Sequence, residues 1–195
     1  MSTNGRNIVV TEFISLDGIV DSPGGEGGYE HTGWTFKEVE PDMAAYELKT
    51  REQEEAGALL VGRVSWDAFH EVWPTMKEFA RYNEIPKYVV STTLTEDDVT
   101  ASPWQPATLL RSMADVAALK ETEGGEIQVH SSADLAKSLA AAGLVDRYHL
   151  LVFPLILGHG KRLFAADGAD KQNLRLVEHD TYGNGIQKLC YEVVR

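Results

Sequence analysis

The residues of this chain best suited to chemistry lie where apolar strands run into glycine. Gly62 and Arg63 end the buried strand within LLVGRVSW, residues 59–66, at the point where a helix should begin. Residues 143–164, GLVDRYHLLVFPLILGHGKRLF, read as a helix end, a long apolar strand and a loop punctuated by glycine. A strand that leads through glycine into a helix N-terminus presents backbone N–H groups to a phosphate. Two such strand ends in one small domain predict a nucleotide that lies across the edge of a sheet.

Other kinds of catalytic chemistry have no motif in the sequence. The six histidines show neither H-x-x-x-H nor H-E-x-x-H spacing, and the single cysteine, Cys190, has no CxxC partner. No G-x-S-x-G nucleophile elbow and no Walker-type phosphate loop occurs. The sequence therefore predicts neither a metal site nor nucleophilic catalysis.

Composition and charge narrow the class of protein. A chain of 195 residues with 43% hydrophobic residues indicates one globular domain spanning 1–195. The net charge of −12 argues against nucleic acid and anionic membranes as partners, and the longest apolar run, 150–157, is too short to span a bilayer. One cysteine and the lack of a signal peptide point to a reducing cytoplasm. A phosphorylated ligand would therefore depend on local basic residues and backbone N–H groups.

Strand and helix patterns alternate along the chain, which predicts an α/β fold with helices on the faces of a sheet. A glycine-rich loop covers 15–36, and Ser131 and Asp134 have the spacing of a capping box. Residues 182–185 predict a turn that joins the last two strands as an antiparallel hairpin. The predicted helices are 41–55, 64–70, 113–123 and 132–142, and the predicted strands are 7–14, 58–62, 87–91, 108–111, 126–130, 147–153, 174–180 and 187–194.

Three motifs in chain order resemble one family. They are SLDG at 15–18, VGR at 61–63, and GLVD followed by PLILGHGKRLF within 143–164. Together they are similar to the dihydrofolate reductase-like superfamily, and specifically to the reductase domain of the riboflavin-biosynthesis deaminase/reductase. The resemblance covers nearly the whole chain. It implies a mixed, mostly parallel sheet flanked by helices with a C-terminal antiparallel hairpin, a bound NADPH, and a homodimer.

The resemblance implies that the ends of the first two strands contact the cofactor through Ile14, Gly62, Arg63, Val64 and Ser65. Gly62 allows a ligand to approach the backbone closely. Arg63 resembles the family residue that meets the phosphates, including the 2′-phosphate that distinguishes NADPH. Judged from the residues alone, the simpler interpretation is that Gly62 is a strand-to-helix turn and Arg63 a surface residue.

The other implied cofactor contacts depart from the family pattern. Ser131, Ser132 and Ala133 stand where the family usually has a glycine pair or Gly-Ser. Because a serine resists positive φ, we expect the pyrophosphate to sit farther away or the turn to differ. Ser91, Thr92 and Thr93 stand where many relatives resemble S-R-T, and the missing arginine weakens the expected preference for NADPH over NADH. Arg63 of the VGR motif is then the main residue expected to distinguish NADPH from NADH.

A hydride transfer needs a cofactor, an aligned ring and a proton source. The resemblance makes Asp17 the candidate catalytic or substrate-orienting carboxylate, although an Asp-Gly turn explains the residue equally well. Trp34 and Asp42 are candidate substrate contacts. Trp34 could stack on a heteroaromatic ring or pack in the core, and Asp42 could contact substrate or only favour the start of a helix.

The leading hypothesis is an NADPH-dependent reductase of a small heterocyclic substrate, similar to the 5-amino-6-(5-phosphoribosylamino)uracil reductase of riboflavin biosynthesis. We expect a stand-alone enzyme, and the acidic balance fits poorly with a ribose-phosphate substrate. One alternative is a dihydrofolate or pterin reductase, against which the lack of a Pro-Trp pair after the Asp-Gly turn counts. Another is a nucleotide-binding dimer without catalysis, which would explain Ser131 and Thr92.

Overall fold

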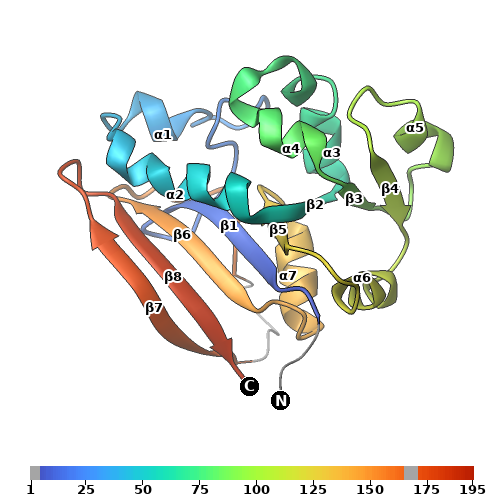
Figure 1. The fold of residues 1–195 in the computed structure, drawn as a ribbon. Helices are drawn as coiled ribbons and strands as arrows, with labels where there is room; N and C mark the ends of the chain where they lie inside the picture. The colour runs from blue at the N-terminus through green and yellow to red at the C-terminus, as the bar shows by residue number, and fades with distance from the viewer. Residues whose placement is uncertain (1–4, 165–170) are drawn as a thin grey trace.

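The computed structural model describes residues 5–164 and 171–195. Within these ranges a single eight-stranded sheet has the strand order β4-β3-β2-β5-β1-β6-β8-β7 (Figure 1). The strands β1 to β6 pair in parallel, whereas β8 is antiparallel to both β6 and β7. The predicted mixed sheet with a C-terminal antiparallel hairpin is therefore confirmed. The strands are β1 (Ile8–Ser15), β2 (Ala56–Gly62), β3 (Lys87–Val90), β4 (Ala107–Leu110), β5 (Glu126–His130), β6 (Arg147–Phe153), β7 (Asn173–Thr181) and β8 (Gln187–Val194).

Helices cover both faces of the parallel part of the sheet (Figure 1). The helices α6 and α7 share a core with one face, and α2, α3 and α4 pack against the other. None of the helices within 5–164 and 171–195 is long and apolar enough to cross a membrane. The helices are α1 (Trp34–Lys37), α2 (Met43–Glu55), α3 (Arg63–Phe69), α4 (Ala80–Glu84), α5 (Glu96–Thr100), α6 (Met113–Lys120) and α7 (Ala133–Ala141), with 3₁₀ turns η1 (Trp73–Thr75) and η2 (Lys77–Phe79).

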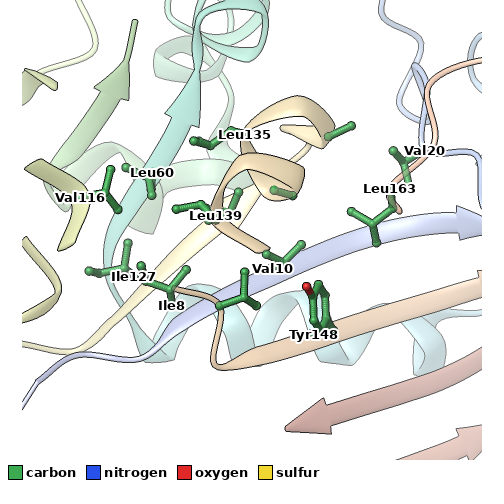
Figure 2. Close-up of a cluster of buried hydrophobic side chains, with 14 of the residues drawn as sticks. Ile8, Val10, Val20, Leu60, Val116, Ile127, Leu135, Leu139, Tyr148 and Leu163 are labelled. Atoms are coloured by element: carbon green, nitrogen blue, oxygen red, sulfur yellow. The ribbon is translucent and has the colours of Figure 1, made fainter. Parts of the chain in front are cut away.

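Alternation along β1 divides its side chains between the two faces of the sheet. Ile8 and Val10 lie in the larger core cluster together with Leu139 of α7 (Figure 2). Thr11 faces the opposite side, where it donates a 2.7 Å hydrogen bond to Glu52 of α2. Each aliphatic side chain buried in this way stabilises the fold by about 1.5–3 kcal/mol. A register shift of one residue would exchange the two sets, so the apolar pattern fixes the register of this central strand.

The other face of the sheet is rich in aromatic side chains. Trp66 stacks against Trp104 with ring centroids 5.7 Å apart, and Phe69 stacks against Trp73 at 4.1 Å. Offset and edge-on contacts of this kind add about 0.5–1.5 kcal/mol per pair beyond the area that they bury. This cluster holds α3 firmly against β2, and α3 begins at the residue after the predicted phosphate-binding glycine.

Two predictions about helix starts are wrong. Pro41 was expected inside the first turn of a helix, but α2 begins at Met43 and Asp42 is its N-cap, accepting a 3.0 Å hydrogen bond from the Ala44 amide. The capping box expected at Ser131 and Asp134 does not form, because Ser132 is the N-cap of α7 and its side chain caps nothing. Complete capping boxes occur instead at the starts of α5 and α6.

Candidate functional site

A cleft of about 550 Å³ opens at the carboxyl ends of β2, β3 and β5. In open α/β sheets this is the edge at which ligands bind. One wall is formed by the starts of α3 and α7, and another by the glycine-rich loop that precedes α1. The predicted cofactor contacts that line the cleft are Gly62, Arg63, Val64, Ser65, Ser131, Ser132 and Ala133.

A small hydrogen-bond network ties the two strand ends together at the base of this wall. The Gly62 amide donates to Ser132 Oγ at 3.2 Å, and Ser132 Oγ lies 2.8 Å from Ser65 Oγ. Ser65 Oγ in turn donates to the carbonyl of Ser131 at 2.7 Å. The Ser132 hydroxyl is therefore engaged with β2 and α3, which explains why it does not cap its own helix. The network fixes the spacing between the two predicted phosphate-binding turns.

Ser131 adopts the conformation that its side chain was expected to resist. Its φ is 53°, in the left-handed region, so the turn is built as a glycine would build it. Ser22, with φ of 45°, is the other non-glycine residue with positive φ in the described ranges, and both serines line the cleft. Such conformations cost of order 1–3 kcal/mol and gather at functional sites. The positive φ that a serine was expected to resist is therefore present at Ser131, at a cost in backbone strain.

The two helices that begin at the cleft have no side-chain cap, a feature that they share with α1 and α4. Neither α3 nor α7 receives a side-chain cap, although Asp42 caps α2, and Thr95 and Ser112 cap α5 and α6. The first-turn N–H groups of α7 therefore remain available toward the cleft, where the helix dipole favours negative charge. A pyrophosphate is the kind of group that such a turn receives. The residues present fit a dinucleotide in this respect.

Arg63 is held at the rim of the cleft by its neighbours. Its Nε donates to Asp67 at 2.7 Å and its Nη1 to Thr93 Oγ1 at 2.9 Å, while the side chain stays half exposed. Ser91 shapes the turn that presents Thr93, because its buried hydroxyl accepts from the Thr93 and Leu94 amides. Ser91 and Thr92 themselves are not among the residues that line the cleft. Thr93, the third residue of the predicted contact segment, is the one that contacts Arg63.

Three other predicted site residues lie away from the cleft lining. Ile14 is buried in the core beneath α7. Trp34 is fully buried, donates from its indole nitrogen to the Asp21 carbonyl at 2.8 Å, and meets Phe153 edge-on. Asp42 lines a separate hollow beside Asn184, where it caps α2. For Trp34 and Asp42 the packing and capping interpretations describe what the structure shows.

Asp17 also lies outside the cleft lining, and its carboxylate is engaged in hydrogen bonds. It accepts from Ser15 Oγ at 2.6 Å and from the amides of Leu157 and Gly158 at 3.1 and 2.8 Å. Partial burial opposes ionisation, but these hydrogen bonds hold the pKa of Asp17 below its ordinary value. An ionised carboxylate with three donors is suited to joining the first strand to the loop after β6. It is poorly suited to giving up a proton near neutral pH.

Glu12 is the carboxyl group that the sequence analysis overlooked. It lies on β1 on the same face as Val10 and Ile14, its exposed fraction is 1%, and neither of its carboxylate oxygens has a hydrogen-bond partner among the described residues. Burial raises the pKa of Glu12 to about 8, an effect opposed by Lys49 and by the nearby Ser132 amide and increased by Glu26. The carboxyl therefore lies behind the Ser132 wall, neutral at pH 7. A glutamate at an inward position of an apolar strand was the available sequence signal.

The cleft carries charges of both signs. Arg63 and Lys161 supply the positive charges, and Asp21, Glu26 and Asp134 the negative ones. Lys161 is partly neutralised, because its Nζ lies 3.9 Å from Asp21. Electrostatic attraction for a highly phosphorylated molecule is therefore confined to the Arg63 side and the α7 N-terminus.

The sheet order, the antiparallel hairpin and the cleft at the carboxyl edge define an α/β protein of the dihydrofolate reductase-like fold, as the sequence motifs implied. Residues 6–188 match the model of the RibD C-terminal domain family, and the chain belongs to that family.

Individual relatives cover the chain almost end to end. The chain is 28% identical to the uncharacterized protein YyaP of Bacillus subtilis (strain 168), with 95% of this chain and 94% of that protein covered. A putative riboflavin biosynthesis protein from Shewanella sp. PV-4 superimposes with a TM-score of 0.71 at 20% identity, over 97% of this chain and 99% of the other. The deaminase/5-amino-6-(5-phosphoribosylamino)uracil reductase of Thermotoga maritima gives a TM-score of 0.64 at 10% identity, over 97% of this chain and 57% of that one. These structural likenesses show the shared fold.

Proposed function

We propose that the protein is an NADPH-dependent reductase that acts on a small heterocyclic substrate. The observation that carries the proposal is the cleft at the carboxyl edge of the sheet, where two uncapped helices begin beside Arg63. Membership of the RibD C-terminal domain family and the reductase named in the Thermotoga maritima relative support the same class of reaction. The cofactor, when bound, supplies the hydride.

The residues that would hold the cofactor follow from the cleft walls. The turn at Ser131 and the first N–H groups of α7 would bind the pyrophosphate, and Gly62 lets the ligand approach the end of β2. The Arg63 guanidinium, anchored by Asp67 and Thr93, would bind the 2′-phosphate. Because Thr92 provides no second cation, selectivity for NADPH over NADH rests mainly on Arg63.

Proton supply is best assigned to Glu12 rather than to Asp17. Glu12 is buried behind Ser132 with a pKa raised to about 8, so it holds a proton at neutral pH. Glu12 is not itself among the residues that line the cleft, whereas Glu26, whose charge contributes to that shift, does line it. Asp17 is instead a positioning residue that anchors the loop at Leu157 and Gly158.

The substrate that fits these charges carries no phosphate of its own. Asp21 and Glu26 give the part of the cleft formed by the glycine-rich loop a negative character. A neutral or cationic heterocycle is favoured there, whereas a ribose-phosphate would need basic partners. The physiological substrate is therefore inferred to differ from that of the riboflavin-pathway reductase.

The proposal is tested first by titrating purified protein with NADPH and NADH while energy transfer from tryptophan to the reduced nicotinamide is followed. We expect micromolar binding of NADPH, equivalent to about −8 kcal/mol. Arg63→Ala should weaken NADPH at least tenfold and NADH far less, because the lost contact is to the 2′-phosphate. Arg175→Ala, which removes an exposed arginine of β7, is the matched control.

A substrate screen follows with pyrimidines and pterins, monitored by steady NADPH oxidation. Turnover supports the reductase, whereas binding without turnover of any tested ring would favour a nucleotide-binding protein. Failure of the wild type to bind either dinucleotide at millimolar concentration would overturn the cofactor assignment and with it the proposed activity.

We also infer a homodimer formed through the C-terminal hairpin. All residues of β7 except Glu178 are exposed, including Leu174, Leu176 and Val177, so an edge strand presents apolar side chains on a surface that a second copy could cover. Sedimentation equilibrium should give twice the monomer mass, and Leu176→Asp should shift the protein toward monomer. A wild-type monomer at tens of micromolar would contradict this assembly.

A further inference from the structure

Three potential metal ligands from two distant parts of the sequence meet near the rim of the cleft. Glu30 and His31 belong to the glycine-rich loop, and His159 belongs to the loop that follows β6. One ligand atom from each residue lies within 4.8 Å of the other two, and His159 Nε2 is 3.5 Å from a carboxylate oxygen of Glu30. The imidazole rings of His31 and His159 have centroids 5.4 Å apart. From these residues we propose a site for a divalent transition metal, with Zn²⁺ as the ion best suited to it.

The donor set determines the chemical class of the ion. Two imidazole nitrogens and one carboxylate oxygen suit Zn²⁺ and its late first-row neighbours, whereas Mg²⁺ and Ca²⁺ prefer sites built from oxygen alone. Metal–ligand bonds of about 2.0–2.2 Å require the three ligand atoms to draw together slightly from their present separation. All three side chains are exposed, so rotations about their side-chain bonds can achieve this. Water would complete a four-coordinate shell.

Contacts outside the donor set hold the histidine backbone in place before any ion arrives. The hydroxyl of Tyr29 donates to the carbonyl of His159 at 2.7 Å, and the Tyr29 ring meets both imidazoles nearly edge-on. Gly160 follows with φ of 123°, and a Cβ there would lie within 3.2 Å of Tyr29 and within 2.9 Å of Ile19. Only glycine allows this close approach. These contacts fix the position of the His159 backbone beside Tyr29.

The position of Glu30, His31 and His159 indicates a structural role for the ion. Gly28, two residues before Glu30, lines the cleft, and so does Lys161, two residues after His159. An ion bound by all three side chains would therefore fasten the glycine-rich loop to the loop after β6 at the rim of the cleft. This inference does not depend on the identity of the substrate or of the cofactor.

The sequence could not reveal such a site. Its ligands show none of the short spacings by which metal motifs are recognised, because His31 and His159 are brought together only by the return of the chain after β6. The distance in sequence between His31 and His159 also leads to a specific expectation. An ion held by these residues must link two segments that are far apart in the sequence.

The test is calorimetric titration of the full-length, chelator-treated protein with ZnCl₂. We expect one saturable site of micromolar affinity or tighter, weakened at least tenfold in His159→Ala and in His31→Ala and moderately in Glu30→Gln. His179→Ala removes an exposed histidine of β7 and should leave affinity unchanged. Circular dichroism of each variant verifies folding, and Glu30→Gln, which preserves side-chain shape, covers the case in which a histidine variant fails to fold.

A second measurement examines the link between the loops. Hydrogen exchange with and without Zn²⁺ should show slower exchange in both segments 26–33 and 157–162 of the wild type and no change in His159→Ala. Absence of a saturable site in the wild type, equal weakening by His179→Ala, or protection of only one segment would overturn the proposal.

Discussion

The cleft side and the α2 side of the sheet each contain one buried glutamate, and the two glutamates differ in their partners and in their pKa. Glu12 of β1 is 1% exposed and Glu52 of α2 is fully buried. Glu12 has no hydrogen-bond partner among the described residues, and burial raises its pKa to about 8. Glu52 experiences the same penalty from burial, but Lys49, His149 and Thr11 outweigh it and lower its pKa to about 2. Partners rather than depth decide which carboxyl is charged.

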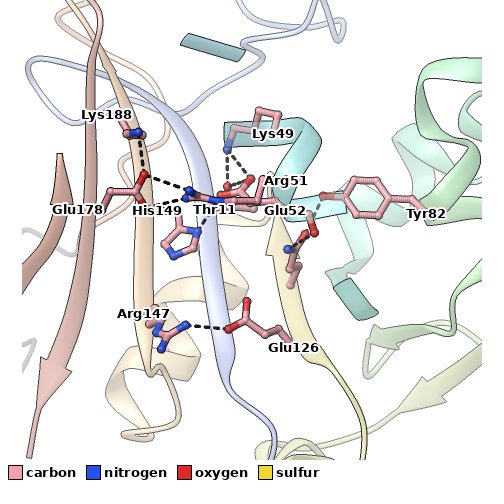
Figure 3. Close-up of polar contacts among 11 residues, drawn as sticks. Thr11, Lys49, Arg51, Glu52, Tyr82, Glu126, Arg147, His149, Glu178 and Lys188 are labelled. Atoms are coloured by element: carbon pink, nitrogen blue, oxygen red, sulfur yellow. Dashed lines mark hydrogen bonds and ion pairs between the residues drawn. The ribbon is translucent and has the colours of Figure 1, made fainter. Parts of the chain in front are cut away.

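On the α2 side, Glu52 and Arg51 are paired within two sets of contacts (Figure 3), although the buried Nδ1 of His130 has no partner among the described residues. Glu52 lies 3.2 Å from Lys49 and 2.9 Å from His149, and it accepts a hydrogen bond from Thr11. Arg51 of the same helix pairs with Glu178, which also pairs with Lys188 at 2.7 Å. These contacts fasten α2 to the central strands and to the C-terminal hairpin. The cleft side holds an unpaired carboxyl and, lining the cleft, the two non-glycine residues with positive φ among the described residues, and strain of this kind gathers at functional sites.

The largest effect is expected where a satisfied buried charge loses its partner. Glu52→Gln keeps the side-chain shape but leaves Lys49 without its anionic partner, so it should lower the free energy of unfolding by about 3–5 kcal/mol. Urea denaturation followed by circular dichroism measures this. Glu47→Gln, an exposed position of the same helix, is the matched control and should change stability by less than about 0.5 kcal/mol. Equal effects at the two positions would remove the contrast between paired and unpaired carboxyls.

Glu12 should make the folded protein less stable as the pH rises. Its folded pKa is raised from 4.5 to about 8, so the stability that it contributes is complete below pH 4.5 and is lost as the pH rises toward 8. The slope is at most about 1.4 kcal/mol per pH unit, which gives about 2–3 kcal/mol between pH 5 and 7. Glu12→Gln should abolish this slope and be more stable than the wild type at pH 7. Unfolding free energies across that range measure it.

The same series distinguishes the two glutamates from each other. Glu52 has a folded pKa lowered to about 2, so its contribution is complete above pH 4.5 and is lost as the pH falls toward 2. Glu52→Gln should therefore flatten the acid limb of the stability profile and leave the region above pH 5 parallel to the wild type. A wild-type profile that lacks the alkaline decline would mean that Glu12 is ionised in the folded protein.

The fold could be predicted from sequence to a greater extent than the site. Apolar alternation and strand ends determine which residues face the core, and β5, for example, has the predicted bounds Glu126–His130. The side-chain roles depend on contacts between distant segments. Asp17 looks the same in sequence whether it faces a ligand or anchors Leu157 and Gly158. Glu12 is notable only after its burial without a partner is known, and the hydrogen bond between Thr93 and Arg63 appears only in the structure.

Asp17 extends the comparison of Glu12 and Glu52, because its carboxylate has hydrogen-bond partners but is only partly buried. Asp17→Asn replaces one accepting oxygen by an amide donor that faces the loop at Leu157 and Gly158, so it should lower the free energy of unfolding by about 1–2 kcal/mol. Faster hydrogen exchange at residues 155–158 is expected as well. Asp42→Asn is the control, because asparagine caps helices as well as aspartate and should leave stability nearly unchanged. A large loss of turnover without any change in this loop would instead return Asp17 to a catalytic role.

The smallest effect concerns strain on the cleft side. Ser131→Gly removes the Cβ that makes φ of 53° unfavourable, and this gain exceeds the added flexibility of the unfolded chain, so stability should rise by about 0.5–1 kcal/mol. Ser131→Ala keeps the Cβ and should be nearly neutral, which separates backbone strain from the hydroxyl group. Differential scanning calorimetry of the three proteins measures both effects. Because Gly relieves strain without altering the turn, NADPH affinity should change little. A gain in stability accompanied by weaker binding would show that the strained serine itself holds the turn in its binding geometry.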